Sequence, residues 1–355
     1  MRILRVLLAA ILISGSLPGF AAWRPAQRID AYLDALAKQE LANGSLAISE
    51  KGQLKYQRAI GSAVIAPGGN EPADTGTRYR VGSVSELFTA ALVMQLAEGG
   101  SITLDNKLAE FFPDVPNALD ITYRDLLAHR SGLADYTSAP DFDTWRTTPQ
   151  TQSEMLERIA TSKPRFPPRQ RQDYSSTNYL LLSYLLEKVY DKPYAALVRL
   201  RIADKLGLAR TYYGQHMNAR RHEALPYEWK SGAWVPARET DPALHLGAGG
   251  MVSSPADLVR FIDALFAGKV VSPTSLDSLR GAHGTALGLP SFDLAGRKAF
   301  GHSGRIDQYR AFVYHFPDTG ISVSYAANAS VLPPDELVDE VIALIFDRAR
   351  RPPAK

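Results

Sequence analysis

Three short stretches of the sequence place hydroxyl groups or an imidazole beside a glycine or a predicted helix start. They are Ser83 to Glu86, Tyr174 to Ser176, and Gly301-His302-Ser303-Gly304-Arg305. A serine at a helix N-terminus lies next to free backbone N–H groups, which makes it a suitable position for a nucleophile. It is also a suitable position for an ordinary helix cap, so each stretch taken alone has a structural interpretation as well.

The first stretch depends on a strand-to-helix junction. An alternating, strand-like run ends at Gly82, and the spacing of apolar residues predicts a helix from Ser83 to Gly99-Gly100. The second stretch follows a Pro- and Arg-rich loop, 165–171, and opens a predicted helix over 177–190. The third lies among predicted strands. The candidate groups are therefore carried by three different kinds of element.

Both ends of the chain combine a helix with strands. Helical spacing over 25–42 ends at Asn43-Gly44, and 336–349 reads as an amphipathic helix. The predicted strands cover 45–50, 54–59, 298–302, 309–316 and 321–327.

The residues between these ends are mostly helix and loop. The simplest architecture is an α/β (α+β) fold, with one antiparallel sheet built from both ends, flanked by helices, and a helical lobe inserted between them. We expect the sheet lobe to comprise 22–82 and 241–355, and the helical lobe 83–240. A cleft between two lobes is the default place for a site.

Composition narrows the class of protein. The chain has 355 residues, of which 45% are hydrophobic and 22% charged, and a net charge of only +3, so no nucleic-acid partner is indicated. It has no cysteine, which excludes disulfides and thiolate chemistry. Residues 1–21 are typical of a cleaved export signal: two arginines, a short apolar run and small residues at the cleavage position. We therefore expect a periplasmic or secreted protein with no stable membrane span after cleavage.

The motifs of the chain, taken together and in order, resemble the serine β-lactamase-related family over roughly 25–348. That family includes class C β-lactamases, D-alanyl-D-alanine carboxypeptidases and related esterases. The resemblance rests on Tyr79-Arg80-Val81-Gly82-Ser83, Leu126-Leu127-Ala128-His129-Arg130-Ser131-Gly132-Leu133, Tyr174-Ser175, Ala248-Gly249-Gly250-Met251 and Gly301-His302-Ser303-Gly304. It implies the β-lactamase/transpeptidase-like fold, with the whole of 25–348 as one domain.

The resemblance also implies acyl transfer through a serine. Ser83 takes the position of the nucleophile, and Tyr174 that of the residue which exchanges protons with it and with the leaving group. His302-Ser303-Gly304 is the third motif, which lines the site and binds the substrate or its carboxylate. Backbone N–H groups of Ser83 and Arg305 would form the oxyanion hole. The family implies a small-molecule or peptide substrate, and we expect no metal and no cofactor.

The sequence departs from the family pattern at two positions near the chemistry. The lysine normally found three residues after the nucleophile is Glu86, and the asparagine that ends the tyrosine motif is Ser176. A carboxylate beside Tyr174 disfavours a tyrosinate by like charge. One such contact at about 4 Å costs ~4 kcal/mol at intermediate dielectric, which is about three powers of ten in rate. The inherited mechanism should therefore fail or be slow unless a cation lies there.

Three interpretations of Glu86 stay open. It can be the general base for Ser83, since desolvation raises the pKa of a carboxyl group. An arginine, such as Arg130 or Arg305, can pair with it. Alternatively Ser83-Val84-Ser85-Glu86 is a capping box, in which the carboxylate binds backbone N–H groups, and this structural use is the one we favour from the sequence. We expect His129 to be structural.

Two functions are consistent with these observations. The first is an exported serine hydrolase of altered or low activity, acting on an ester, amide or D-amino-acid peptide through an acyl-serine. In it the catalytic residues are Ser83, Tyr174, Glu86 and His302, and the substrate-binding and oxyanion residues are Ser176, Ser303, Gly304 and Arg305. The second is a catalytically inactive relative that binds a cell-wall peptide or a protein partner in the same cleft.

Overall fold

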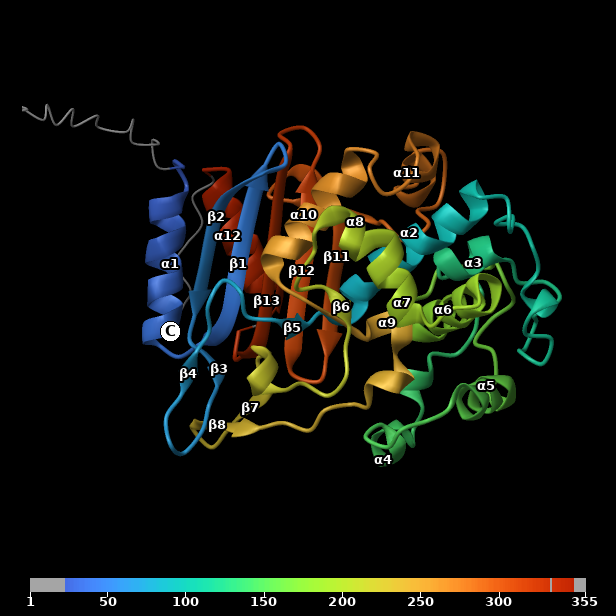
Figure 1. Ribbon diagram of the computed structural model, residues 1–355, viewed down its shortest axis with the longest axis horizontal. Coiled ribbons are helices and arrows are strands. Elements are labelled where there is room, and N and C mark those ends of the chain that lie inside the picture. Colours follow the sequence, from blue (N-terminus) through green and yellow to red (C-terminus); the bar gives the residue numbers. More distant parts are fainter. Residues whose placement is uncertain (1–22, 333, 348–355) are drawn as a thin grey trace, which may run out of the picture.

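The structure is a computed structural model that describes residues 23–332 and 334–347. The predicted export signal, 1–21, lies outside these residues. Within them, six strands form one antiparallel sheet in the order β10-β11-β12-β13-β1-β2 (Figure 1). Its strands are β1 Ala42–Glu50, β2 Gln53–Ile60, β10 Ser291–Leu294, β11 Arg297–Ile306, β12 Tyr309–Phe316 and β13 Ile321–Ser330. The first strand pairs with the last, so the sheet is built from both ends of the chain, as the sequence predicts.

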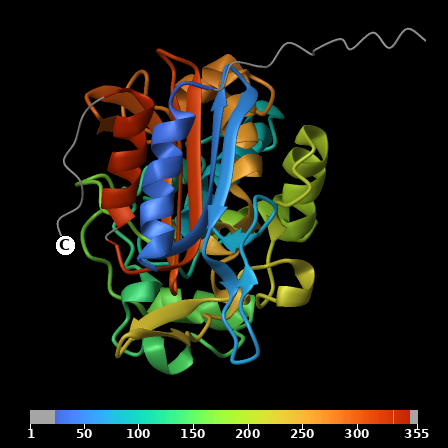
Figure 2. The same ribbon diagram turned by 90° about the vertical axis from the view of Figure 1, so that its left-hand side faces the viewer.

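Helices cover both faces of this sheet. Helices α1 (Ala26–Lys38) and α12 (Pro334–Ile345) lie side by side on one face (Figure 2). Helix α10 (Pro255–Phe266) packs on the opposite face, against β1, β12 and β13. Strand residues alternate between two hydrophobic cores, so that Phe312 and Tyr314 belong to the α1 and α12 side while Ala311 and Val313 belong to the other.

The helical region contacts the sheet mainly at its β11 edge. It begins with a 3-10 turn, η1 (Gly82–Val84), which contacts β11 and runs into α2 (Ser85–Glu98). The other helices are α3 Tyr123–Leu127, α4 Phe142–Trp145, α5 Gln152–Thr161, α6 Ser176–Tyr190, α7 Tyr194–Val198, α8 Asp204–Leu206, α9 Leu246–Gly249 and α11 Pro273–Leu279. The smaller strands are β3 Ser62–Val64, β4 Glu71–Pro72, β5 Tyr79–Arg80, β6 Tyr212–Tyr213, β7 Tyr227–Lys230, β8 Ala233–Pro236 and β9 Met251–Ser253.

One predicted boundary is wrong. Helix α1 ends at Lys38, and Asn43-Gly44, which were expected to terminate it, belong to β1. A Cβ atom at Gly44 would lie 2.5 Å from the carbonyl oxygen of Ala326 on the neighbouring strand. The glycine therefore serves the close approach of β1 to β13 and not the end of a helix.

Candidate active site

Ser83 sits in η1, pressed against the edge of the sheet. Gly82 has a left-handed backbone, with φ of 52°, and a Cβ atom there would lie 2.8 Å from the backbone nitrogen of Arg305 on β11. A Cβ atom at Gly304 would in turn lie 2.8 Å from the backbone nitrogen of Ser83. The two glycines let the turn and the strand meet backbone to backbone, which no larger residue would allow.

Backbone N–H groups on the unpaired edge of β11 point toward the turn that carries Ser83. The N–H of Gly301 donates away from β12, to the carbonyl of Pro290. Because hydrogen-bonding direction alternates along a strand and the β11–β12 register is unbroken, the N–H groups of Ser303 and Arg305 point the same way. The amide of Arg305 thus faces the turn that carries the amide of Ser83.

Glu86 does not cap the helix. Its side chain is fully buried, and neither η1 nor α2 has a side-chain hydrogen bond at its N-cap. The carboxylate instead points toward Tyr174, which donates a hydrogen bond of 2.5 Å to Oε1. The capping interpretation favoured from the sequence is therefore wrong, because hydroxyl and imidazole donors occupy the carboxylate oxygens.

Tyr174 links Glu86 to the candidate nucleophile. Its hydroxyl lies 2.7 Å from Oγ of Ser83. Since the phenol proton is donated to Glu86, the hydrogen bond from Ser83 must be donated to the phenol oxygen. The side chain of Tyr174 is partly exposed to the cleft, but desolvation of its hydroxyl, followed by the charge and hydrogen bond of Glu86, raises the pKa of Tyr174 well above its usual value. The residue is therefore a neutral phenol.

Two histidines lie against the other oxygen of Glu86. Nε2 of His129 is 3.2 Å and Nε2 of His302 is 3.5 Å from Oε2. The cation that the sequence led us to seek at Arg130 or Arg305 is therefore a histidine. Arg130 donates elsewhere, to the carbonyl of Arg169 and to Thr285.

The surroundings of the two imidazoles differ. His302 faces acceptors on both sides, since Nδ1 lies 2.6 Å from the carbonyl oxygen of Ser303 and Nε2 faces the carboxylate. His129 Nδ1 faces two donors, the N–H of Ser175 at 3.3 Å and the amide nitrogen of Asn178 at 3.2 Å. His302 therefore fits a doubly protonated imidazolium, and His129 a neutral imidazole with its proton on Nε2.

The pKa values follow from this arrangement. Burial raises the pKa of Glu86, but the contacts with His129 and His302 lower it more, so the net pKa lies below the ordinary value of 4.5. Burial lowers the pKa of His302, but the hydrogen bond and charge of Glu86 raise it more, to a net value above 6.5. These opposite shifts favour a carboxylate–imidazolium pair between Glu86 and His302.

His129, expected from the sequence to be structural, lies in direct contact with the candidate site. Besides contacting Glu86, it adopts a left-handed backbone with φ of 53°, which is unfavourable for a residue with a side chain. Sequence reasoning also missed Asn178, whose Oδ1 accepts a hydrogen bond of 2.6 Å from Ser131, so that its amide group points at His129. No local pattern in the sequence signals this contact, because His129 and Asn178 are 49 positions apart.

A cleft of about 950 Å³ opens over these groups and is lined by residues of the helical region and of the sheet. Of the candidate residues, only the buried Glu86 does not line this cleft. Those that do are Ser83, Tyr174, Ser176, His302, Ser303, Gly304 and Arg305. Ser176, at the position of the family asparagine, lies 3.5 Å from Oδ2 of Asp135 on the helical side. In the described part of the chain, no ion pair joins Asp135 to a cationic side chain.

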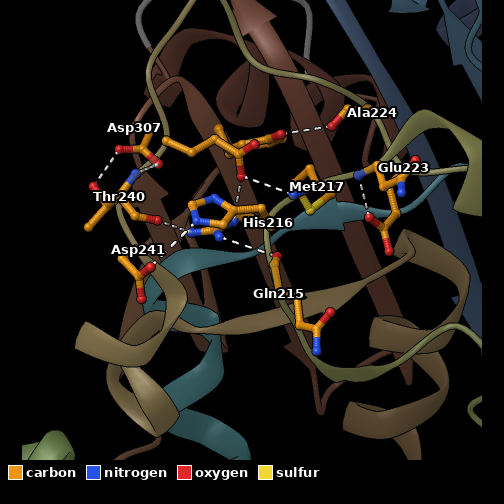
Figure 3. A network of polar contacts seen from close by, with 12 residues as sticks. Gln215, His216, Met217, Glu223, Ala224, Thr240, Asp241 and Asp307 are labelled. Atoms are coloured by element: carbon orange, nitrogen blue, oxygen red, sulfur yellow. Dashed lines mark hydrogen bonds and ion pairs between the residues drawn. The ribbon is translucent and has the colours of Figure 1, made fainter. Parts of the chain in front are cut away.

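A second polar network, drawn in Figure 3, includes Thr240 and Asp307, which line the same cleft. Asp307, in the β11–β12 turn, accepts hydrogen bonds from the N–H and hydroxyl of Thr240 and pairs with Arg146. Arg80 is buried and lies close to the turn that carries Ser83. It pairs with Glu239 and donates a hydrogen bond to the carbonyl oxygen of Thr240. This network ties the end of β11 to the segment that precedes α9.

Two further features concern only the residues that the structure describes. Among 23–332 and 334–347, no three histidine, cysteine, aspartate or glutamate side chains converge in a way that could hold a metal ion. None of the helices described has the length and apolar character that a membrane span requires.

Comparison with known proteins identifies relatives along nearly the whole described chain. A family profile described as Beta-lactamase matches residues 27–346. The teichoic acid D-alanine hydrolase of Staphylococcus aureus is 28% identical over 260 residues, which are 73% of this chain and 62% of that protein. The chain therefore aligns with less than two thirds of this curated relative.

Solved structures agree in fold. The D-amino acid amidase of Ochrobactrum anthropi SV3 superposes with a TM-score of 0.78 at 25% identity, covering 92% of this chain and 99% of the amidase. FmtA from Staphylococcus aureus gives a TM-score of 0.77 at 22% identity, covering 92% and 90%. The octameric penicillin-binding protein homologue from Pyrococcus abyssi gives 0.77 at 22% identity, covering 91% and 77%.

Proposed function

Because the chain belongs to the beta-lactamase family of serine hydrolases, we propose that it removes a D-aminoacyl group from an ester or amide through an acyl-enzyme on Ser83. The observation that carries this proposal is the continuous line of hydrogen bonds from Ser83 through Tyr174 to Glu86. The substrate class is suggested by the names of two relatives, a teichoic acid D-alanine hydrolase and a D-amino acid amidase.

The hydrogen-bond line replaces the family lysine with a relay. As Ser83 Oγ attacks the carbonyl carbon, its proton passes to the oxygen of Tyr174 and the phenol proton passes to Oε1 of Glu86. The tyrosine stays neutral throughout, so its raised pKa does not hinder the transfer. Glu86 thus serves as the proton acceptor without ever contacting the serine.

His302 makes the carboxylate compatible with this chemistry. Before attack, the negative charge of Glu86 is balanced by the imidazolium of His302. Once Glu86 is protonated, the imidazolium is left unbalanced just as negative charge forms on the substrate oxygen. That oxygen is stabilised by the amides of Ser83 and Arg305 and by the nearby positive charge.

The remaining steps reverse the proton path. The bond between the carbonyl carbon and the leaving oxygen or nitrogen breaks, and the leaving group takes a proton from Tyr174, which is resupplied by Glu86. Water then attacks the acyl-serine, gives its proton to the same relay, and Ser83 regains one as the acid leaves. One water is consumed for each ester or amide cleaved, and no other reactant is needed.

Three observations support action outside the cytoplasm and on aminoacyl substrates. The first 21 residues have the composition of an export signal, and the name of one relative refers to teichoic acid. The carboxylate of Asp135, on the helical wall of the cleft, suits the free ammonium group of a D-aminoacyl moiety.

The proposal is tested with the mature protein and a D-alanyl p-nitrophenyl ester. We expect ester hydrolysis, and a transient acyl adduct on Ser83 by intact mass, both lost in Ser83→Ala. Substitution of Ser85, whose hydroxyl is buried and donates to the carbonyl of Gly82, is the matched control for serine removal at this turn. If the wild-type protein showed no hydrolysis and no adduct, the proposal would be rejected and the inactive, ligand-binding alternative favoured.

A further inference from the structure

A second pocket, of about 380 Å³, lies outside the cleft that contains Ser83. It is lined from three parts of the chain: the residues of α3 and just after it, the Pro- and Arg-rich loop 165–171, and the segment 277–287, which begins at the end of α11. Its volume falls in the range of small-ligand pockets, about 300–1,000 Å³. Because three arginines line it, Arg124, Arg130 and Arg169, we call it the arginine pocket.

Two carboxylates also line the arginine pocket, and both are already paired. Asp125 pairs with Arg169 at 2.8 Å and accepts hydrogen bonds from the N–H and hydroxyl of Thr122. Asp277 pairs with Arg280 at 2.6 Å. Neither carboxylate is therefore free to balance a further cation.

Arg130 is the arginine of this pocket that lacks a carboxylate. Across the residues that the structure describes, it forms no ion pair, whereas Arg124 pairs with Asp105. Its guanidinium donates from Nη2 to the carbonyl of Arg169 at 2.5 Å and from Nη1 to the hydroxyl of Thr285 at 3.4 Å. Its Nε is buried and has no hydrogen-bond partner in the same part of the chain. Since a buried donor on a charged group is costly to leave unpaired, the pocket calls for a further acceptor.

Thr285 adds a hydroxyl donor to this cation. Its oxygen accepts the hydrogen bond from Arg130, so the hydroxyl proton is left for another acceptor. Thr285 is exposed on the loop after α11 and lines the pocket together with Arg130. A planar guanidinium and a neighbouring hydroxyl suit the several oxygens of a phosphate group, which can accept from both at once.

The arginine pocket is separated from the candidate active site by a wall formed by 127–130 and 285–288. Residues of these two segments alternate between two pockets. Those that line the arginine pocket are Ala128, Arg130, Thr285 and Leu287. Those that line a smaller pocket, of about 130 Å³, are Leu127, His129, Ala286 and Gly288. Tyr174 and His302 also line the smaller pocket, whereas the arginine pocket shares no lining residue with the 950 Å³ cleft. An anion bound in the arginine pocket would therefore lie behind the catalytic groups and not among them.

We propose that the arginine pocket binds a phosphate group, with Arg130 as its counter-ion and Thr285 as a hydrogen-bond donor. The phosphate completes the pairing of Arg130 as Asp105 and Asp125 complete that of the other two arginines. Free phosphate and a phosphodiester of a polyanionic chain both present the required oxygens. This second site is independent of the acyl transfer proposed for Ser83.

The test is isothermal titration calorimetry of the mature protein with three compounds. Sodium phosphate represents the free ion, glycerophosphoglycerol represents a phosphodiester within a chain, and glycerol is the neutral control. We expect at least one of the two phosphate compounds to bind and glycerol not to bind. Tighter binding of sodium phosphate identifies the free ion as the source, and binding of the diester at least as tightly identifies a polyanionic chain. If neither phosphate compound bound, the proposal would be overturned.

Variants assign the binding to the arginine pocket. Arg130→Gln should weaken phosphate binding at least about tenfold, because it removes a charge-assisted hydrogen bond. Arg130→Lys should retain part of the affinity, because the cation remains without the guanidinium fork. Arg199→Gln is the matched control, since Arg199 is exposed on the π-helical segment Arg199–Ala203, and it should leave the affinity unchanged.

Thr285→Val keeps the test decisive even if the Arg130 variants do not fold. It removes the hydroxyl from an exposed loop with little change in shape, and should weaken phosphate binding at least about threefold. Phosphate affinity that is unchanged in Thr285→Val and in a folded Arg130→Gln protein would overturn the site. Because the titrations need no turnover, phosphate binding by a protein that hydrolyses no ester would contradict only the proposed function.

Discussion

Two buried polar networks border the same cleft, and they differ in the cations that balance their carboxylates. Glu86 is balanced by the imidazolium of His302, and it also contacts the imidazole of His129. Asp307 is balanced by the guanidinium of Arg146. A guanidinium never loses its proton in a protein, whereas an imidazole does so near neutral pH.

The networks also end on different groups. The network of Glu86 ends on the hydroxyl of Ser83, which faces the cleft. The network of Asp307 and Arg80 ends on backbone groups, including the N–H and carbonyl of Thr240. The first is therefore suited to moving a proton and the second to holding the end of β11 in place. The following predictions test this division, beginning with the largest effect.

Glu86→Gln should abolish most activity. The amide keeps the shape of the side chain but cannot accept the proton that Tyr174 passes on. General-base removal costs about 10²–10⁴ in rate, so we expect kcat to fall by about 10³ with the D-alanyl ester. Asp307→Asn, the same chemical change in the other network, is the control and should lower kcat by less than about tenfold. A Glu86→Gln protein with near wild-type kcat would exclude the relay.

His302→Gln should change the shape of the pH–rate profile as well as its height. In wild type, activity requires Glu86 ionised and His302 protonated. The pKa of Glu86 is lowered, so the acid limb lies below the ordinary carboxyl range, and that of His302 is raised, so the alkaline limb lies above 6.5. Glutamine can still donate to Glu86 but carries no charge.

We therefore expect kcat of His302→Gln to fall by about 10² and the alkaline limb to disappear. The profile of kcat against pH between the acid and alkaline extremes measures both effects. An alkaline limb that persists unchanged in the variant would assign that titration to a group other than His302.

The sequence predicts the scaffold of the site better than its electrostatics. The strands predicted near both chain ends and the helix predicted over 177–190 follow from local patterns, and they are confirmed as β1, β2, β11, β12, β13 and α6. Each depends on residues within a few positions of one another, where propensity and capping chemistry decide the outcome.

The partners of Glu86 could not be deduced in this way. His129 and His302 are 173 positions apart and meet only because η1 contacts β11. A local rule, the capping box, gave a plausible but wrong partner for the carboxylate, since its S-x-x-E spacing is satisfied in the sequence alone. Long-range packing then decides which donors reach a buried carboxylate.

Asp307→Asn should act mainly on stability. The Asp307 carboxylate is only 2% exposed and accepts three hydrogen bonds, from Arg146 and Thr240. Loss of its charge leaves Arg146 paired with the exposed carboxylate of Asp143 and hydrogen-bonded to the hydroxyl of Thr240. We expect a loss of about 2 kcal/mol in the free energy of unfolding, measured by urea denaturation, with no change in the pH limbs of kcat. An altered alkaline limb would contradict the separation of the two networks.

Asp105→Asn should have the smallest effect, because it removes the same kind of arginine–carboxylate pair from the surface. Arg124 and Asp105 are 46% and 73% exposed, so water already solvates both charges. The hydrogen bond to Arg124 lowers the pKa of Asp105, so its contribution is present at neutral pH and is lost as pH falls. We expect a change below about 0.5 kcal/mol at neutral pH, and less at high salt. Urea denaturation of both aspartate variants measures the difference. If Asp105→Asn lowered the free energy of unfolding as much as Asp307→Asn does, burial would not explain why the pair beside the cleft is stronger than a surface pair.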